Sequence, residues 1–156
     1  MLETREMRPE DVPACVRILN HIIGLGGTTA YETPFDVATL DTKYRQEPPV
    51  CNVALSAGRV VGFLAAFQDG PDFYSIGSFT DRQRPVTGAG QALFRKTLAD
   101  CRERGGEAIL AKITADNTGG LAFYTRLGFV DDHVIPSDHT RPDGTIVDRI
   151  VKRHPL

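Results

Sequence analysis

Two glycines, Gly88 and Gly90, stand directly before an apolar, helix-forming run in the segment RPVTGAGQALF (84–94). Because glycine lacks a Cβ, a ligand can approach the backbone closely and positive φ is accessible without strain. A strand that leads through such a loop into a helix points several N–H groups and the positive end of the helix dipole toward one place. Arg84 is placed to add positive charge. The spacing predicts an anion site, with a strand-to-helix turn that binds nothing as the alternative.

Two other kinds of chemistry are disfavoured. The glycine segment contains neither Gly-x-Gly-x-x-Gly nor Gly-x-x-x-x-Gly-Lys-Ser/Thr, so a dinucleotide-binding or P-loop fold is not expected. The three cysteines are widely spaced with no CxxC pair, and the four histidines do not fall at zinc-ligand spacings. We therefore expect no disulfide framework and no metal site.

The composition bounds the class of protein. The chain has 156 residues, 41% of them hydrophobic, and a formal net charge of -2. This length suits a single domain over 1–156, and a charge so near balance argues against a nucleic-acid partner. No apolar stretch reaches the roughly 18 to 20 residues that span a bilayer. Because the charged N-terminus lacks the apolar centre of a signal peptide, we expect a cytoplasmic protein with no membrane partner.

The elements that must position the glycine segment follow from hydrophobic periodicity. In the first half, a short strand is followed by a helix that starts near Pro9 and stops at Gly24 and Gly26, and then by a Gly/Thr-rich loop. Asp36 can cap a second helix, which ends at the prolines of QEPP (46–49).

From Cys51 the period changes to two. A hairpin turning at Ala57 and Gly58 is expected over 51–67, and a helix follows the glycine segment. The remaining predicted elements are strands at 73–79, 107–115, 129–135 and 146–154, and a short helix at 116–128 capped by Asn117 or Thr118. The sum is an α+β fold, a mixed sheet with helices on its faces.

A second motif, ADNTGGLAFYTRLGF (115–129), follows the strand expected at 107–115. Together with the glycine segment it resembles the GCN5-related N-acetyltransferase (GNAT) family, whose R/Q-x-x-G-x-G/A loop holds the pyrophosphate of CoA. The resemblance covers essentially the whole chain. It implies a central twisted sheet, mixed but mostly antiparallel, of six or seven strands with about four helices, and an enzyme that uses acetyl-CoA without a metal.

The resemblance also implies roles by position. The backbone of Phe79 and Thr80 would pair with the pantetheine arm, and the Asn117 side chain would hydrogen-bond that arm near its thioester. Tyr124 would stand close to the sulfur and protonate the departing thiolate. The pyrophosphate would be held by Arg84 and by the amides of Thr87, Gly88, Ala89, Gly90 and Gln91.

The chain departs from the family pattern in two places. The family's Arg or Gln position, three residues before the first glycine, holds Pro85, and Arg84 stands one residue earlier. Gly119 and Gly120 follow Asn117 in the first turn of the expected helix, where each glycine costs helix stability of about 1 kcal/mol. These two glycines either leave room for a ligand or have no role.

The general base is left open among three candidates. The strand at 73–79 carries no carboxylate. Glu32 lies in the loop between the first two helices, which borders the acceptor pocket in this fold. Asp81 follows the middle strand at its ligand end, and a chain of waters is the third possibility.

The acceptor is suggested by NHIIGLGGTTAYETPF (20–35), which is similar to the phosphinothricin/methionine-sulfoximine acetyltransferase branch. This similarity implies a small, polar primary amine such as an amino acid. Arg141, beside His139 in a loop that could close the pocket, would pair with a substrate carboxylate. The alternatives are a CoA-binding regulatory module without turnover and a structural domain that only keeps the fold. Relatives often pair, so a homodimer is plausible.

Overall fold

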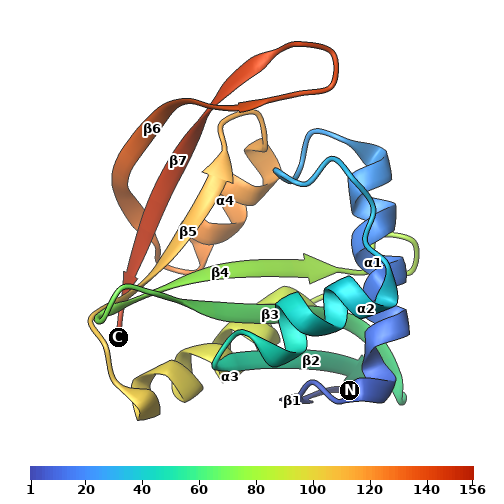
Figure 1. Ribbon diagram of the computed structural model, residues 1–156. Helices are drawn as coiled ribbons and strands as arrows, with labels where there is room; N and C mark the ends of the chain where they lie inside the picture. Colours follow the sequence, from blue (N-terminus) through green and yellow to red (C-terminus); the bar gives the residue numbers. More distant parts are fainter.

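Figure 1 shows the computed structural model, which describes all 156 residues. Seven strands form one sheet in the order β1-β2-β3-β4-β5-β7-β6. The strands are β1 (Leu2–Glu6), β2 (Val50–Ser56), β3 (Arg59–Asp69), β4 (Phe73–Thr80), β5 (Ala108–Thr114), β6 (Val130–Thr140) and β7 (Ile146–Pro155). The helices are α1 (Val12–Leu25), α2 (Val37–Leu40) continued by the π-helical segment η2 (Asp41–Gln46), α3 (Ala89–Arg104) and α4 (Thr118–Arg126). A 3-10 turn (Pro9–Asp11) leads into α1.

The sheet is mixed but mostly antiparallel, as predicted. Every neighbouring pair is antiparallel except β4 and β5, which run parallel. Their ladder is short, from Phe73 opposite Ala108 to Ile76 opposite Ala111. Beyond that point β5 turns away from β4 (Figure 1). Residues 77–80 therefore pair with β3 alone.

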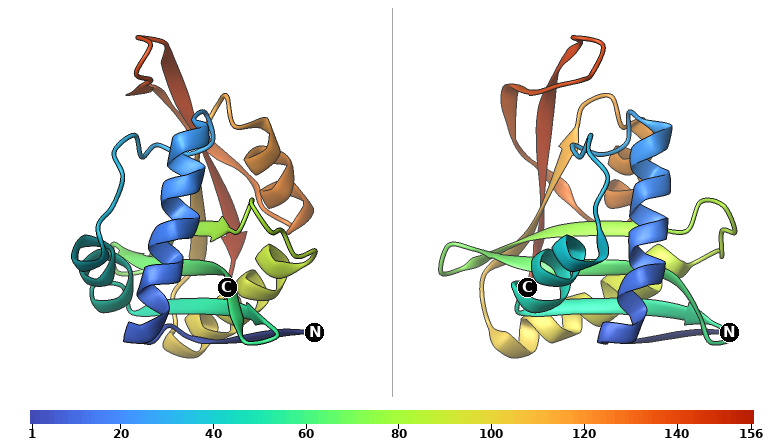
Figure 2. Two further views of the ribbon diagram at one scale, coloured as in Figure 1. Left: turned by 90° about the vertical axis from the view of Figure 1, so that its right-hand side faces the viewer. Right: turned by 45° about the vertical axis from the view of Figure 1, so that its right-hand side comes forward.

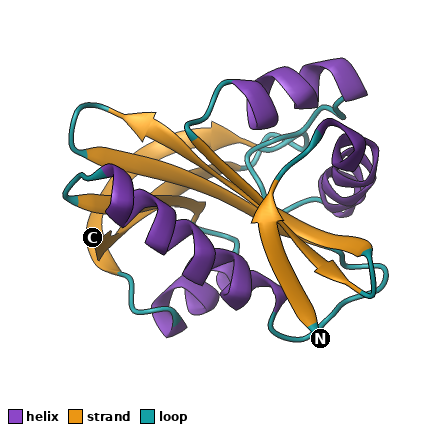
Figure 3. Ribbon diagram, turned by 90° about the horizontal axis from the view of Figure 1, so that it is seen from below, coloured by secondary structure: helices purple, strands orange, loops and turns teal.

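Helices cover both faces of the sheet (Figure 3). Alternation along β3 divides the core: Phe63 and Ala65 pack with α1 and α2, whereas Leu64 and Ala66 pack with α3 and α4. All four side chains are fully buried, which explains why this strand is a continuous apolar run rather than an alternating one. None of the helices combines the length and apolar character that crossing a membrane requires.

Local turn chemistry matches the sequence at the hairpin and departs from it at β6. Ala57 and Gly58 have φ of 50° and 76°, the positive values that a two-residue hairpin turn needs. Strand β6 was expected to end at 135 but continues to Thr140, through a register shift that includes Ser137 at φ 51°. The long partner β7 supplies the ladder that the sequence around 136–138 does not itself favour.

Candidate active site

The separation of β4 from β5 opens a cleft of about 1170 Å³. Helix α1 with the loop that follows it stands on one side of the opening, and α4 stands on the other (Figure 2). The walls are formed by 28–31, the outer half of β4, most of the β4–α3 loop, 116–120 and the end of β5. The sequence-predicted residues Phe79, Thr80, Gly88, Ala89, Gly90, Asn117 and Tyr124 all line it.

The glycine segment forms the N-terminus of α3 at one end of the cleft. Gly88 is the N-cap residue at φ 88°, a left-handed conformation that favours glycine. No side chain caps this helix. The backbone N–H groups without a hydrogen-bond acceptor in the protein include those of Thr87, Gly88, Gly90 and Gln91. Four such donors at the positive end of a helix dipole are what an anion site requires.

Gly90 serves packing between the two helices of the cleft. A Cβ at this position would lie 2.9 Å from Cζ of Phe123 on α4, closer than real side chains approach. Phe123 also lines the cleft. The second glycine therefore lets α3 begin directly against α4, which closes the cleft behind the row of free N–H groups.

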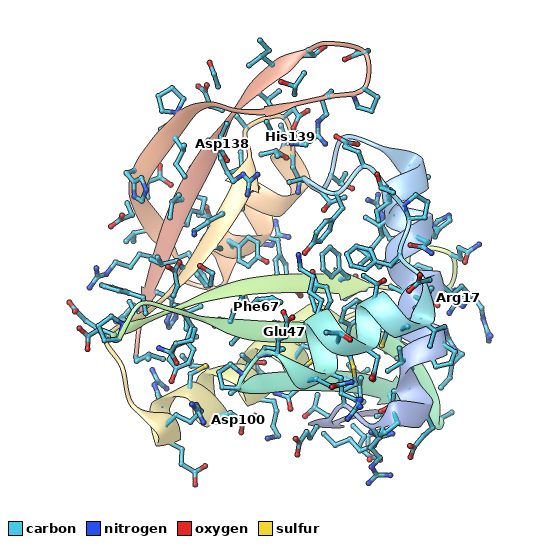
Figure 4. The ribbon with its side chains drawn as sticks, in the orientation of Figure 1. Arg17, Glu47, Phe67, Asp100, Asp138 and His139 are labelled. Atoms are coloured by element: carbon cyan, nitrogen blue, oxygen red, sulfur yellow. The ribbon has the colours of Figure 1, made fainter.

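Asp81, a candidate base in the sequence, shapes the β4–α3 loop. Its buried carboxylate accepts the N–H groups of Gln83 and Arg84 and pairs with Arg17 and Arg59, each at 3.0 Å. Figure 4 shows Arg17 on α1, across from the loop. Burial opposes ionisation, but the Arg17 hydrogen bond and the two amides outweigh it and lower the pKa of Asp81 to about 2. The carboxylate is therefore ionised. Both of its oxygens already accept hydrogen bonds from the protein, so it is poorly placed to take a proton from a substrate amine.

Two arginines flank the cradle differently from the sequence prediction. Arg84 donates its backbone N–H to Asp81, and its exposed side chain is not part of the cleft wall. Arg82 does line the cleft. Sequence reasoning passed over Arg82 because it lies farther from the glycines, yet the turn made by Asp81 brings it to the wall.

The outer edge of β4 offers backbone to a ligand. Phe79 and Thr80 line the cleft, and Phe79 is fixed by packing against Phe63 with ring centroids 5.3 Å apart. Because β5 has turned away, the backbone from Gly77 to Thr80 is paired on one side only. An extended ligand can add there as a strand would.

Asn117 is the N-cap of α4 and also ties that helix to the loop after α1. Its Oδ1 accepts the Gly120 N–H at 2.9 Å, and its Nδ2 donates to the Thr28 carbonyl at 3.0 Å. A Cβ on Gly120 would lie 2.9 Å from Asn117 Cγ and closer still to its Nδ2, whereas a Cβ on Gly119 would meet only Asn117 Oδ1, at 4.0 Å. Gly120 thus makes room for the cap. The predicted contact of Asn117 with a cofactor stays a prediction.

Tyr124 lies at the back of the cleft on α4. Its ring packs edge-on against Phe123 and Phe129, with centroids 5.2 and 5.1 Å away. The hydroxyl makes no hydrogen bond within the protein, and burial raises its pKa above the ordinary value for tyrosine. The phenol is therefore protonated at neutral pH and keeps its proton available to a ligand.

A family model named Acetyltransferase (GNAT) family matches residues 16–129, well over half of the chain. The chain belongs to this family. The predicted family and enzyme class, an acyltransferase, are thereby confirmed. Among curated proteins, none matches the chain in sequence.

Solved structures agree with the GNAT assignment at the level of fold. A ribosomal-protein-alanine N-acetyltransferase from Brucella melitensis has a TM-score of 0.86 at 21% identity, covering 99% of both chains. A phosphinothricin acetyltransferase from Sinorhizobium meliloti, solved with acetyl-CoA, has a TM-score of 0.86 at 19% identity, covering 99% of this chain and 88% of that one. A GCN5-related N-acetyltransferase from Kribbella flavida has a TM-score of 0.86 at 22% identity, covering 99% and 98%.

Glu32 lies behind the wall of the GNAT cleft. Its Oε2 is 2.6 Å from His139 Nε2 and 3.1 Å from Arg141 Nη1, so the loop after α1 is joined to β6 and to the turn that follows it. Hydrogen bonds from His139 and then Arg141 lower the pKa of Glu32 despite the opposing effect of desolvation. Glu32 is not part of the cleft lining. It is held as an ionised anchor for the loop rather than as a free carboxylate.

Arg141 is committed to the same ion-pair group. It is 7% exposed, donates to the carbonyl of Thr29, and pairs with Asp116 at 2.8 Å as well as with Glu32. Its side chain lies outside the cleft lining. The predicted pairing of Arg141 with a substrate carboxylate would require these contacts to break.

The GNAT cleft is also lined by groups that no linear motif marked. They are Thr28 and Tyr31 from the loop after α1, Lys43 and Tyr44 from η2, Ser75 from β4, Lys112 from β5 and Arg149 from β7. The Tyr31 and Tyr44 hydroxyls are 2.6 Å apart. Sequence reasoning had no local signal for these residues, because five separate segments bring them together.

Proposed function

We propose that this protein transfers an acetyl group from acetyl-CoA to the primary amine of a small molecule, an amino acid or an analogue, by direct attack of the amine on the thioester. The observation that carries the proposal is the row of four N–H groups without an acceptor at the start of α3, of which those of Gly88 and Gly90 line the same cleft as the free edge of β4 and Tyr124. A domain spanning 1–156 would contain the whole site.

The donor end fits the parts of acetyl-CoA. The free N–H groups of Thr87, Gly88, Gly90 and Gln91 would hold the pyrophosphate, and Arg82 or Arg84 would add charge. The predicted contribution of the Ala89 amide would require it to leave the Val86 carbonyl, which accepts its N–H at 3.3 Å. The open edge at Phe79 and Thr80 would pair with the amide-containing pantetheine arm. Bound there, acetyl-CoA supplies an activated acyl group. The acetyl-CoA complex of the similar Sinorhizobium meliloti protein supports this donor.

Three tasks of the chemistry are assigned to groups of this chain. An N–H on the unpaired stretch of β4 would stabilise the negative charge that develops on the thioester oxygen. The Tyr124 hydroxyl would give its proton to the departing thiolate. Asp81 and Asp116, the carboxylates that line the cleft, are held by arginines, so water is the favoured acceptor for the proton of the amine. Glu32 as the base stays a prediction that Glu32→Gln would test.

The first experiment is calorimetric titration with acetyl-CoA, followed by a thiol-release screen over amino acids and simple amines. We expect micromolar affinity, about -8 kcal/mol, and turnover with at least one small primary amine. Binding without turnover on any amine would favour the regulatory module instead. If millimolar acetyl-CoA does not bind, the cradle is not a donor site and the proposal fails.

A further inference from the structure

Most of the charged side chains around the acceptor end of the cleft have an ion-pair partner of opposite charge, but not all of them do. Among all the residues that line the cleft, two carry a carboxylate: Asp81 and Asp116. Arginines behind the wall hold both of them, at 3.0 and 2.8 Å respectively. The cleft therefore offers no uncommitted carboxylate to a positively charged group of a substrate.

Three cations line the acceptor end, and two of them have a carboxylate partner. Lys112 Nζ lies 3.0 Å from Asp69, and Arg149 Nε lies 2.9 Å from Asp138. The Arg149 contact is an ion pair by distance only, because its Nε is buried and makes no hydrogen bond. Both partners lie outside the lining, and each partly offsets the charge of its cation. Lys43 is the third cation.

Lys43 has no carboxylate within ion-pair distance and donates no hydrogen bond in the protein. Its Nζ lies 4.9 Å from the centroid of the Tyr31 ring, which also lines the cleft. Tyr31 is fixed in turn by the hydroxyl contact with Tyr44 and by edge-on packing on Phe35, with centroids 5.0 Å apart. A half-buried ammonium is thus held on a fixed aromatic face, with its N–H donors free.

We propose that Lys43 selects acceptors that carry an anionic group, a carboxylate or a similar oxyacid, on the same small molecule as the reacting amine. The proposal rests on the proposed function and deepens it. The anion would take the three donors of Lys43 and leave the amine to point toward the β4–β5 separation. Diamines and basic peptides are disfavoured, because the second positive charge would meet Lys43 and no free carboxylate.

The test compares each accepted amino acid with the amine that lacks its carboxylate, for example leucine with isoamylamine and phenylalanine with phenethylamine. For the wild type we expect a preference of about tenfold or more in kcat/KM for the amino acid. Lys43→Met is expected to lower kcat/KM for the amino acid about 10- to 100-fold, mainly by raising KM, and to leave kcat/KM for the amine unchanged. Lys43→Arg should retain most of the preference.

Two matched variants locate the effect. Lys112→Met removes a cleft lysine that already has a carboxylate partner, and Lys96→Met removes a lysine of α3 paired with Asp100 outside the cleft. Neither should abolish the preference for the carboxylate. Three results would show that Lys43 is not the anion site. Lys43→Met could lower kcat/KM equally for the amino acid and the amine, could leave both values unchanged, or could lower the affinity for acetyl-CoA.

Calorimetric titration of the CoA-bound protein with the same amino acids separates this inference from the proposed function. Binding that Lys43→Met abolishes, in a protein that acetylates nothing, would uphold the anion site and overturn the transferase activity. Turnover without any preference for the carboxylate would uphold the activity and overturn the anion site. Neither binding nor turnover would overturn both.

Discussion

The two ends of the cleft are built from different material. The donor end uses main chain: free N–H groups at the start of α3 and the unpaired edge of β4, all within the continuous stretch 77–91. The acceptor end uses side chains, among them Tyr31, Lys43 and Arg149, which come from segments far apart in the sequence. One end depends on backbone shape and the other on tertiary contact.

This difference predicts that the two ends carry different kinds of specificity. A main-chain cradle recognises phosphate and amide groups that any acyl-CoA presents, whatever the acceptor. Side chains at the other end can change their chemistry without disturbing the backbone of the sheet. A fold of this kind can keep one donor and vary its acceptors, and substrate must therefore be argued from the acceptor end.

Tyr124 lines the cleft and is the proposed proton donor, so the removal of its hydroxyl is expected to have the largest effect. Tyr124→Phe keeps the ring that packs on Phe123 and Phe129 but removes the hydroxyl proton. We expect kcat to fall about 100-fold or more, with acetyl-CoA affinity unchanged. Steady-state kinetics and calorimetry on the same variant measure both quantities. Unchanged turnover would remove Tyr124 from the chemistry.

Asp81 tests whether the main-chain conformation of the β4–α3 loop depends on side-chain contacts. Asp81→Asn keeps an acceptor for the Gln83 and Arg84 amides but loses the charge that pairs with Arg17 and Arg59. From a pKa of about 2 in the fold, we expect the free energy of unfolding at pH 7 to fall by about 2 kcal/mol. Acetyl-CoA affinity should fall with it, because the loop is less ordered. Urea unfolding and calorimetry measure the two changes.

The pH dependence of that effect has a definite sign. The pKa of Asp81 is lower in the fold, about 2, than the roughly 3.9 of an unfolded aspartate, so its contribution is present above pH 4. The contribution is lost as pH falls from about 4 to about 2, where both states bind the proton. The stability difference between wild type and Asp81→Asn should therefore shrink over this window. A difference that stayed constant to pH 2 would show that charge is not the cause.

Arg141 offers the opposite test, because its contacts hold the loop after α1 and do not reach the β4–α3 loop. Arg141→Met would release the loop at Thr29 and Glu32, and would free Asp116 as an unpaired carboxylate in the cleft. We expect KM for the amine to rise about tenfold, with acetyl-CoA affinity within about twofold of wild type. Arg141→Lys keeps the charge but loses the planar guanidinium, so its KM for the amine should lie between those of the wild type and Arg141→Met. An equal loss of acetyl-CoA affinity would show that the two ends are not independent.

Much of the fold could be predicted from the sequence because its signals are local. The hairpin at Ala57 and Gly58, the stop of α1 at Gly26 and the cap at Asn117 each depend on residues within one turn. The extension of β6 to Thr140 could not be predicted in this way. It depends on pairing with β7, and Ser137 adopts positive φ only within that pair.

The candidate site divides along the same line. Gly88 and Gly90 marked the donor end because a backbone shape requires glycine there. Glu32 was expected at the acceptor pocket, yet its partners His139 and Arg141 lie more than a hundred positions away and hold it behind the wall. No sequence pattern marked Lys43. It stands out because no carboxylate pairs with it in the fold, and that absence cannot be predicted from neighbouring residues.

The smallest predicted effect concerns the adjacent glycines of α4, which differ only in their surroundings. Gly119→Ala places a methyl group at an ordinary contact distance, 4.0 Å from Asn117 Oδ1, and should raise the free energy of unfolding by roughly 0.5 to 1 kcal/mol, the helix preference of alanine. Gly120→Ala has the same preference but drives its Cβ against the Asn117 side chain, which must give up the cap and the Thr28 contact. We expect it to be destabilising by about 1 kcal/mol and to weaken amine binding, as the loop at Thr28 loses its anchor. Thermal unfolding of both variants, with KM for the amine, measures the contrast. Equal shifts in the two variants would mean that the cap does not couple α4 to the acceptor end.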